Sequence, residues 1–368
     1  MPNHVKGQKL KIKEQKSENK NSCSDENEVA ELNLGNPNYS SHSLLCIGNA
    51  IVDVYATVDN NFYKNMGITE QVQHIELEQA QRILKNLENP VFKSGGGAAN
   101  VAHIAAALNV KAVFSGCAGN DASANFFENE LRNSRVLPDL KNANTATGMC
   151  LILHNGTESR IAVCPAAALE YSETDLNEAA FDKASAVVID GYFLNRQPLV
   201  NRILDYANSR KLPVAIDAGS EHIIKENACE ILNYCKNSRL IFFMNADESI
   251  AFYAAVSKNR YEFKFKRENE KIAMILNEVC LMLITLTGKH YPIFVVKLGE
   301  YGAVAAAEGQ IYHEETEPVK TQNTIGAGDA FCAAFMKEYL AEKSISECLA
   351  FGNKVAGEML QQNRLRDF

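Results

Sequence analysis

The chain has 368 residues, of which 46% are apolar and 22% are charged, as expected for a globular protein with one large domain or two smaller ones. The net charge of −8 leaves no basic surplus to release counterions, which argues against nucleic-acid binding. The ten cysteines form no C-x-x-C pair, which argues against a zinc site, and several lie in apolar runs typical of reduced thiols in a cytoplasmic protein. No apolar run approaches the roughly 18–20 residues that a membrane span needs.

Residues 1–42 differ from the rest of the chain. The first twenty contain six lysines and no aromatic residue, and the stretch that follows is rich in acidic residues, Asn and Ser. Low hydrophobicity combined with blocks of charge is typical of a disordered or loosely packed extension. We therefore expect the folded domain to span residues 43–368.

The first folded segment is a short apolar run, Leu44–Ile47, which predicts a buried strand that ends at Gly48-Asn49. The chain then resumes an apolar pattern that contains one acidic residue, Asp53. A buried carboxylate is unfavourable unless it is paired. Asp53 therefore either caps a local turn or faces a ligand, and the polar Asn49 nearby favours the ligand.

A predicted helix over residues 78–88 precedes three consecutive glycines, Gly95, Gly96 and Gly97, which open an Ala-rich helix. Asn100 lies in the first turn of that helix and can both donate and accept hydrogen bonds, as vicinal sugar hydroxyls require. The alternative is a helix-start residue that bonds locally. The G-x-G-x-x-G dinucleotide pattern is not met, because Asn100 occupies the sixth place.

A β-hairpin is predicted where Met149–His154 and the run 160–164 flank Asn155-Gly156. Together with the strand after Asp53, it is expected to form a small sheet separate from the main one. Arg160 on this hairpin is a candidate phosphate contact, although an Arg that is simply solvated is the commoner finding.

From residue 170 onward, predicted strands alternate with helices, which indicates a parallel sheet covered on both faces. The strands are expected at 186–190, 214–217, 240–244 and 293–297, and the helices at about 175–182, 198–210, 225–235 and 247–255. Ligands in this architecture bind beyond the carboxyl ends of the strands. Three polar residues are expected there, namely Asp190, Asp217 and Asn245.

Asn245 and Glu248 lie about one helical turn apart, and such an oxygen pair can position water molecules on Mg²⁺. The alternative is a capping box, with Asn245 as N-cap and Glu248 at the N3 position. Further along, the strand near 295 enters a Gly-x-x-Gly turn at Gly299 and Gly302, which suits either a nucleotide site or a plain hairpin. A final helix over 344–363 carries Asn353 near the expected nucleotide cleft.

The segment 321–335 leads from polar residues through Gly326, Ala327, Gly328 and Asp329 into an Ala-rich helix. Small residues let a ligand approach the backbone, and the free N–H groups of a helix start attract anions such as phosphate. A carboxylate beside such a site can take a proton from a hydroxyl that attacks phosphorus. The alternative is an ordinary turn in which Asp329 caps the helix.

These elements, in this order, resemble the ribokinase or pfkB carbohydrate-kinase family over roughly residues 44–360. The similar motifs are Gly-Gly-Gly-Ala-Ala-Asn at 95–100, N-A-D-E at 245–248 and N-T-I-G-A-G-D-A-F at 323–331. The segments 48–54 and 67–69 are most similar to the adenosine-kinase-like branch. No single motif is as specific as their joint occurrence.

The resemblance implies an α/β, ribokinase-like fold with a central, mostly parallel sheet flanked by helices, and a small β lid formed from segments near 53–60 and 149–164. Asp329 would be the catalytic base beside an anion hole of Gly326, Ala327 and Gly328. The other implied roles are Mg²⁺ and its waters at Asn245 and Glu248; substrate hydroxyls at Asp53, Gly96, Gly97 and Asn100, with Asn49 nearby and Arg160 in the lid; and ATP at Lys297, Gly299, Gly302 and Asn353.

The function expected from this resemblance is ATP-dependent phosphorylation of a primary hydroxyl on a nucleoside or sugar, with an adenosine-like nucleoside favoured. The alternatives are a kinase for ribose, fructose or a related sugar, and a non-catalytic nucleoside-binding sensor on the same fold. The family usually has Asp-Thr where this chain has Asn323-Thr324. The lost charge at Asn323 weakens the case for K⁺ activation.

Overall fold

Parallel strands form the centre of the fold, as the alternation of strands and helices predicted. The computed structural model describes residues 40–257, 264–320 and 324–364, within the unit Asn38–Phe368. Its large sheet has nine strands, and only the last two along the chain run antiparallel to their neighbours. In spatial order they are β14 (Gln310–Glu314), β13 (Ala303–Ala307), β12 (Ile293–Lys297), β11 (Leu240–Asn245), β10 (Val214–Asp217), β9 (Ala186–Asp190), β1 (Ser43–Ile47), β5 (Lys111–Ala118) and β6 (Val136–Asn142).

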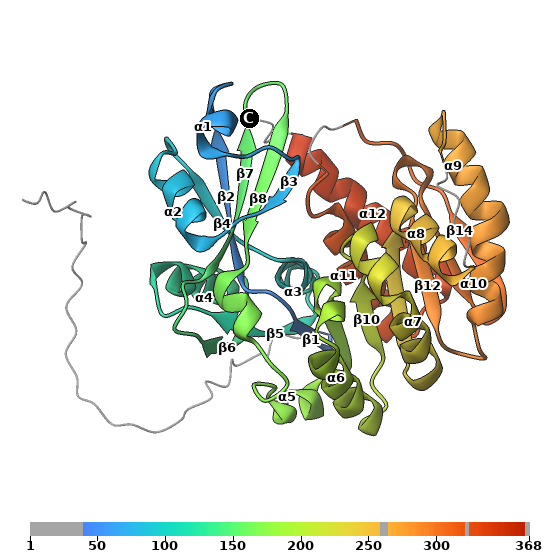
Figure 1. Cartoon of the computed structure of the whole chain (residues 1–368). Helices are drawn as coiled ribbons and strands as arrows, with labels where there is room; N and C mark the ends of the chain where they lie inside the picture. The colour runs from blue at the N-terminus through green and yellow to red at the C-terminus, as the bar shows by residue number, and fades with distance from the viewer. Residues whose placement is uncertain (1–39, 258–263, 321–323, 365–368) are drawn as a thin grey trace, which may run out of the picture. The chain divides into compact units, whose positions relative to one another are not determined.

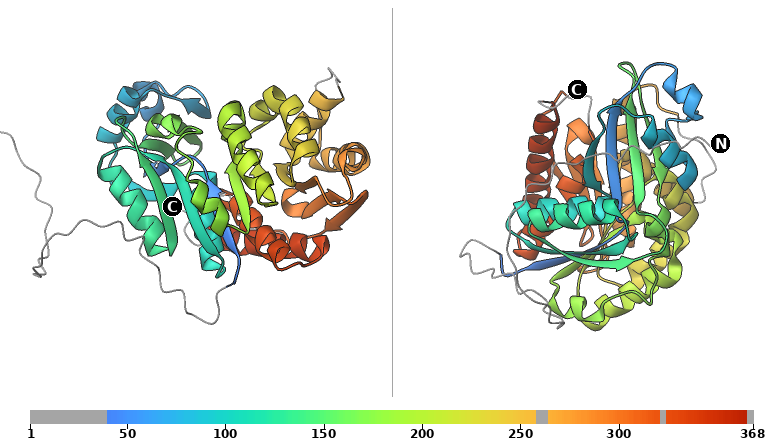
Figure 2. Two further views of the ribbon diagram at one scale, coloured as in Figure 1. Left: turned by 90° about the horizontal axis from the view of Figure 1, so that it is seen from below. Right: turned by 90° about the vertical axis from the view of Figure 1, so that its left-hand side faces the viewer.

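Helices cover both faces of this sheet (Figures 1 and 2). Side chains alternate along each buried strand, so that Phe243 of β11 packs into one hydrophobic core and its neighbours Phe242 and Met244 pack into the other. The first core is closed by α3 (Gly97–Ala107), α11 (Ala327–Leu340) and α12 (Ile345–Arg364). The second is closed by α6 (Gln197–Ser209), α7 (Glu221–Asn237) and α8 (Ala246–Val256). Burial on both faces explains why these strands read as continuous apolar runs.

A second sheet of five strands contains the predicted hairpin. Gly156 has a φ of 88° in the turn between its strands, a conformation that favours glycine. The strand next to the hairpin includes Asp53 itself and pairs in parallel with the first strand of the hairpin. In spatial order the strands are β3 (Val72–His74), β8 (Ser159–Cys164), β7 (Gly148–His154), β2 (Ile51–Thr57) and β4 (Val91–Gly95).

The remaining helices differ little from the predicted ones in place but differ in length. The predicted helix 225–235 begins earlier, at Glu221, because the Ser220 hydroxyl accepts a hydrogen bond from the Ile223 N–H at 3.4 Å. The predicted helix 78–88 ends at Lys85. The helices not yet named are α1 (Phe62–Met66), α2 (Leu77–Lys85), α4 (Ala122–Asn133), α5 (Glu178–Lys183), α9 (Glu268–Met274) and α10 (Cys280–Leu286).

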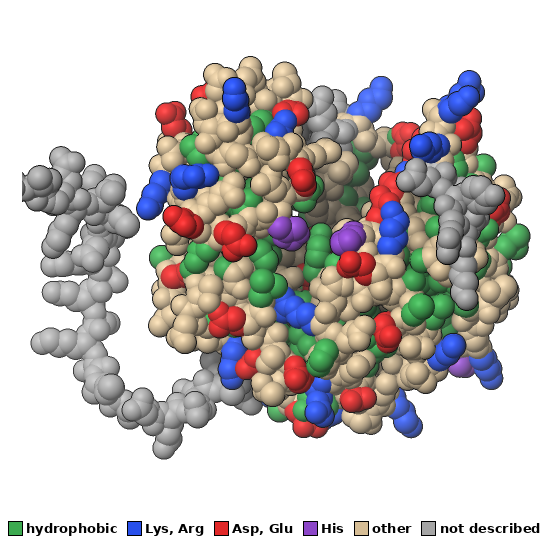
Figure 3. Space-filling model, viewed as in Figure 1, with side chains coloured by type: hydrophobic (Ala, Val, Ile, Leu, Met, Phe, Trp, Pro, Cys, Tyr) green, Lys and Arg blue, Asp and Glu red, His purple; other side chains and the backbone are tan. Residues whose placement is uncertain are grey.

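The surface carries acidic and basic side chains interspersed over the face shown in Figure 3. Among the residues that the structure describes, no helix is both long and apolar enough to cross a bilayer. The nine cysteines in the described ranges are free thiols, and Cys229 is the exposed one. The extension expected over 1–42 falls almost entirely outside the described residues, as does Asn323.

Candidate active site

The start of α11 is built around Gly326, which precedes the first helical residue and has a φ of 81°. An L-amino acid with a side chain is strained in this left-handed conformation, so the sequence needs glycine here. Among the described residues the space beside it is open, since a Cβ at Gly326 would meet only the Met359 methyl there, at 3.7 Å. No side chain in the described part of the chain caps this helix start, and of its first N–H groups that of Ala327 donates to the Thr324 carbonyl at 3.2 Å.

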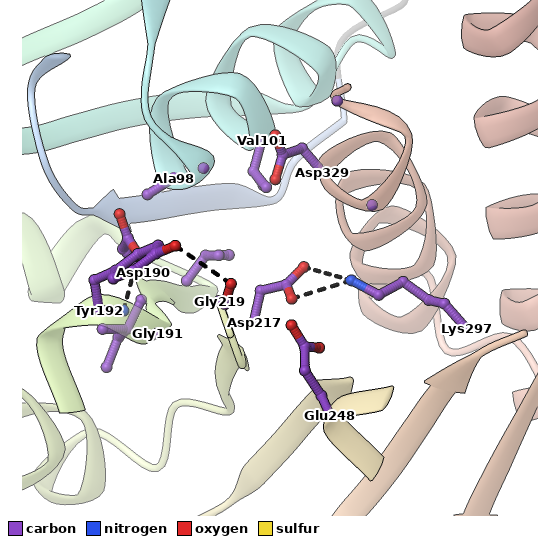
Figure 4. A pocket seen from close by; sticks show the side chains of 15 residues that line it. Ala98, Val101, Asp190, Gly191, Tyr192, Asp217, Gly219, Glu248, Lys297 and Asp329 are labelled. Atoms are coloured by element: carbon purple, nitrogen blue, oxygen red, sulfur yellow. Dashed lines mark hydrogen bonds and ion pairs between the residues drawn. The ribbon is translucent and has the colours of Figure 1, made fainter. Parts of the chain in front are cut away.

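Asp329 lies in the first turn of α11 and contacts the start of α3 (Figure 4). The Asn100 side-chain amide donates a hydrogen bond to Asp329 Oδ2 at 2.8 Å, although the two residues are 229 positions apart. A Cβ at Gly97 would lie 3.4 Å from Asp329 Oδ1, so the absence of a side chain there lets the carboxylate approach. The two glycine-containing helix starts predicted from the sequence therefore meet at one carboxylate.

The surroundings of Asp329 favour its protonated form. Burial raises the pKa of Asp329 to about 7, and the Asp217 carboxylate adds to the effect. The hydrogen bond from Asn100 and the charge of Lys297 act in the opposite direction. A carboxyl group whose pKa lies near neutrality can both accept and release a proton at physiological pH, as a general base must.

A cavity of about 230 Å³ lies beside Asp329 (Figure 4). It opens at the carboxyl ends of β9, β10 and β12, where ligands bind in parallel α/β sheets. The ionisable and aromatic side chains that line it are Asp190, Tyr192, Asp217, Glu248, Lys297 and Asp329. Gly97, Gly326 and Gly328 also line it, so the cavity adjoins both helix starts.

Lys297 and Asp217 form an ion pair inside the cavity, with Lys297 Nζ 2.7 and 3.0 Å from the two carboxylate oxygens. Burial acts against the Lys297 charge, but Asp217 outweighs it and leaves the pKa of Lys297 raised. Glu248 is buried beside the pair, and burial raises the pKa of Glu248 to about 7 against the opposing effect of Lys297. Lys297 and Glu248 therefore influence each other's protonation, and Asp217 influences both.

Asn49 lies outside the lining of the cavity, between two charged residues, of which Asp190 lines it. Its amide donates to Asp190 Oδ2 at 3.4 Å, and Arg196 donates to its Oδ1 at 3.2 Å. A side chain at Gly96, whose φ is 92°, would overlap the Asn49 carbonyl oxygen. This backbone contact fixes the start of α3 against the loop after β1.

Asp53 lies on β2 against Gly95, where any side chain would overlap its carboxylate. Burial raises the pKa of Asp53 to about 7, opposed by Lys93. Asp53 thus packs against Gly95, the residue that precedes Gly96 in the chain. It belongs to the small sheet and does not line the described cavity.

Asn245 and Glu248 form both hydrogen bonds of the capping box that was the alternative interpretation of this motif. Asn245 Oδ1 accepts from the Glu248 N–H at 2.9 Å, and Glu248 Oε2 accepts from the Asn245 N–H at 2.7 Å, which is a capping box at the start of α8. Glu248 also lines the cavity, whereas Asn245 is exposed at the end of β11. Among the described residues, no group of three or more His, Cys, Asp or Glu is arranged to hold a metal ion.

Four other predicted site residues lie outside the lining of this cavity. Arg160 Nη1 donates to the Ile68 carbonyl at 2.6 Å, and its guanidinium covers the Tyr63 ring. Gly299 and Gly302 form the tight turn of the β12–β13 hairpin, and Asn353 donates to the Glu314 carbonyl at 2.8 Å. These positions keep their predicted roles as proposals only.

The sequence did not assign the cavity residue Tyr192 to the site, and it placed Asp190 and Asp217 only at the strand ends where ligands bind. The sequence feature that indicates such residues is an acidic residue at the end of an apolar strand, as Asp190 and Asp217 both are. Tyr192 gave no such signal, because a Tyr in a turn is common on protein surfaces. Its ring is 45% exposed, and its hydroxyl donates to the Gly219 carbonyl at 3.4 Å.

Comparison with known proteins shows which family this chain belongs to. Adenosine kinase 2 of Arabidopsis thaliana is 25% identical over 343 residues, which cover 87% of this chain and 94% of the relative. The 5-dehydro-2-deoxygluconokinase of Clostridium beijerinckii is 25% identical over 290 residues, with 74% of this chain and 80% of the relative covered. Among solved structures, adenosine kinase from Sinorhizobium meliloti has the same fold, with a TM-score of 0.72, 21% identity and coverage of 88% and 95%. The family model for pfkB family carbohydrate kinases matches residues 41–367. The chain is therefore a kinase that belongs to the pfkB family of carbohydrate kinases, with the ribokinase-like fold expected from its motifs.

Proposed function

We propose that the protein transfers the γ-phosphoryl group of ATP to a primary hydroxyl of a nucleoside or sugar, with an adenosine-like nucleoside as the first candidate. The observation that carries this proposal is the position of Asp329. It is held by Asn100 at the uncapped start of α11 and lines a cavity at the carboxyl ends of the strands. A base and an anion site are thus adjacent, as phosphoryl transfer to an alcohol requires.

In this reaction Asp329 takes the proton of the substrate hydroxyl as its oxygen attacks the γ-phosphorus. The new bond joins that oxygen to phosphorus, and the bond between phosphorus and the β–γ bridging oxygen breaks to release ADP. The N–H groups around Gly326, Ala327 and Gly328 face the phosphoryl oxygens during transfer. The role of the protein is mainly to position the reactants and stabilise charge.

Magnesium supports the reaction by offsetting the charge of the phosphate oxygens. We propose Glu248 and Asn245 as the residues that hold its water molecules, because Glu248 lines the cavity at the level of Asp217 (Figure 4). Lys297 lies on the same side, and Gly299, Gly302 and Asn353 are proposed to border the rest of the nucleotide. The five-stranded sheet is proposed to act as the lid that excludes water.

The cavity chemistry bears on the alcohol substrate. Asp190 is 8% exposed, lines the cavity and has a pKa raised by burial, so it suits the hydroxyl groups of a neutral substrate. The exposed face of Tyr192 beside it suits a stacked ring, which supports a nucleoside. A kinase for ribose, fructose or a related sugar is the second candidate, because the relatives include a sugar-acid kinase as well as adenosine kinase.

The test is an ATP-consumption assay with adenosine, inosine, ribose and fructose. We expect turnover with a nucleoside, and we expect Asp329→Asn to lower kcat by roughly 10²–10⁴-fold while the variant remains folded, as its cooperative thermal melting would show. Turnover of only ribose or fructose would support the second candidate. Absence of turnover with all four alcohols by a folded wild-type protein contradicts the proposed function.

A further inference from the structure

The Lys297–Asp217 pair reaches across a strand. Lys297 ends β12 and Asp217 ends β10, and β11 lies between them in the sheet. Neighbouring strands are about 4.8 Å apart, so the two side chains bridge nearly 10 Å over the end of β11. Their contact therefore lies above the strand ends, in the cavity, and is not part of the packing between neighbouring strands.

Fold stability alone is a weak explanation for this pair. The side chains of Lys297 and Asp217 are only 17% and 23% exposed. The free energy needed to remove two charges from water often equals or exceeds what their attraction returns. Among the residues that the structure describes, both hydrogen bonds of the Lys297 ammonium go to the one carboxylate, although an ammonium group has three donors. Within the described residues, the third donor has no assigned acceptor.

The ammonium also lies against the start of α11. A Cβ added to Gly328 would lie 3.1 Å from Lys297 Nζ, so the absence of a side chain at 328 lets the cation reach the backbone there. Gly328 is one of the residues at which a transferring phosphoryl group is proposed to sit. The cation and the helix start thus face the same small space (Figure 4).

The charge balance of the cavity makes this cation significant. Among the described residues that line it, Lys297 is the one Lys or Arg, whereas the lining holds four carboxyl groups, those of Asp190, Asp217, Glu248 and Asp329. A phosphoryl group carries negative charge, and four nearby carboxyl groups oppose its entry. A mobile ammonium that can exchange one anionic partner for another offsets this repulsion at the point where charge develops.

We propose that Lys297 is a further catalytic residue, which donates a hydrogen bond to an oxygen of the γ-phosphoryl group during transfer, and that Asp217 is the residue that positions its ammonium. This role rests on the proposed function. Lys297 keeps its proton throughout, because the substrate proton goes to Asp329. The phosphorus–oxygen bonds that form and break are those already described. Lys297 stabilises the negative charge on the γ-phosphoryl group during its transfer.

The test compares Lys297→Met with Asp217→Asn. We expect Lys297→Met to lower kcat by roughly 10²–10³-fold, as removal of one donor to a developing anion does, with the KM for the alcohol little changed. Lys297→Arg keeps the charge in a bulkier, planar form and should recover part of kcat. Asp217→Asn should lower kcat less than Lys297→Met does, because the Lys297 ammonium is still present. If the ion pair had a structural role alone, the two substitutions should lower kcat equally.

Lys271 provides the matched control. Its ammonium pairs with Asp247 at 2.7 Å, and its side chain is 14% exposed, close to the 17% of Lys297. It does not line the cavity. Lys271→Met should therefore alter the melting temperature to a similar extent while leaving kcat within about twofold of the wild type.

A second measurement does not depend on turnover. Calorimetry would compare binding of ADP alone with binding of ADP, Mg²⁺ and aluminium fluoride, which imitates the transferring group. Lys297→Met should weaken the fluoride complex by at least about tenfold, which is about 1.4 kcal/mol, and leave ADP affinity unchanged. Equal affinities of wild type and Lys297→Met for the fluoride complex, or an unchanged kcat, would overturn the proposal. Inactivity of the wild type on every alcohol contradicts the proposed function instead, and Lys297-dependent fluoride binding would then still support the role of the lysine.

Discussion

The starts of α3 and α11 are similar in sequence but differ in what surrounds them. Both are rich in glycine, both have a glycine of positive φ before the helix, and neither is capped by a side chain. At α3 the space is filled, because the Asn49 carbonyl occupies the position where a side chain of Gly96 would lie. At α11 the space around Gly326 is open apart from one methyl group.

The same glycine-rich pattern thus serves two physical purposes. In α3 it permits close packing of backbone on backbone, which fixes Asn100 so that its amide can hold Asp329. In α11 we propose that the first-turn N–H groups, apart from that of Ala327, which donates to the Thr324 carbonyl, are available to an anion in the cavity. On this proposal the first helix start is a support and the second is a binding surface. Four substitutions test this division.

The largest effect is expected from Asp329→Asn. If Asp329 is the base, its loss should lower kcat by roughly 10²–10⁴-fold, about 3–5 kcal/mol of transition-state stabilisation. Steady-state kinetics with the preferred alcohol measures this. The pKa of Asp329 is raised to about 7 in the fold, so the protonated form stabilises the native state and that stabilisation is lost as pH rises through 7. Asp329→Asn should therefore gain stability relative to the wild type as pH rises from about 4 to about 7, and should keep that gain at higher pH. Full activity of the variant would refute the assignment.

Gly96→Ala should give the next largest effect. The added methyl group meets the Asn49 carbonyl, and its positive φ adds strain. Strain of about 1–2 kcal/mol and overpacking of about 1–3 kcal/mol together predict a loss of about 2–5 kcal/mol in the free energy of unfolding. Urea denaturation measures it. A loss below about 1 kcal/mol would show that the α3 start is not a tightly packed support.

Asn100→Ala removes the hydrogen bond that joins the two helix starts. A hydrogen bond to a charged group contributes about 1.5–3 kcal/mol, so kcat/KM at neutral pH should fall by about tenfold or more. This bond lowers the pKa of Asp329, so its removal raises that pKa. We expect the acidic limb of the kcat/KM profile, near pH 7 in the wild type, to move to higher pH. An unmoved limb would mean that a group other than Asp329 is the titrating base.

Gly326→Ala should have the smallest effect on stability. The methyl group has room, and only the strain of the positive φ remains, about 1–2 kcal/mol. Gly156→Ala is the matched control, because Gly156 has a φ of 88° and no atom within 4 Å of an added Cβ. Urea denaturation of the two variants should give similar losses. A much larger loss for Gly326→Ala would show that this helix start is packed like that of α3.

The sequence predicted those elements whose signals are local. Buried strands such as β9 and β11 appear as apolar runs, and Asn155-Gly156 identifies its hairpin by turn chemistry alone. Asp329 was predicted as a site residue because the glycines that it needs are its neighbours in sequence. The hydrogen bond from Asn100 was not predicted, because it joins residues 229 positions apart.

The cavity was harder to predict, because its composition depends on strand order. Asp217 meets Lys297 only because β10 and β12 flank β11, and no local pattern gives that order. Glu248 shows a different limit. Glu248 belongs both to a capping box with Asn245 and to the lining of the cavity, so the sequence motif is equally consistent with a structural and a functional role.

The links between the two sheets have a mechanical consequence. The chain passes from β1 to β2 through Gly48, Asn49 and Ala50, and from β4 to α3 through Gly96. Both passages run through residues that contact the floor of the site. A tilt of the five-stranded sheet would therefore pull on Asn49 and on the helix that orients Asp329. An antibody fragment that clamps the outer edge of that sheet would then slow catalysis from a distance, without competing with either substrate.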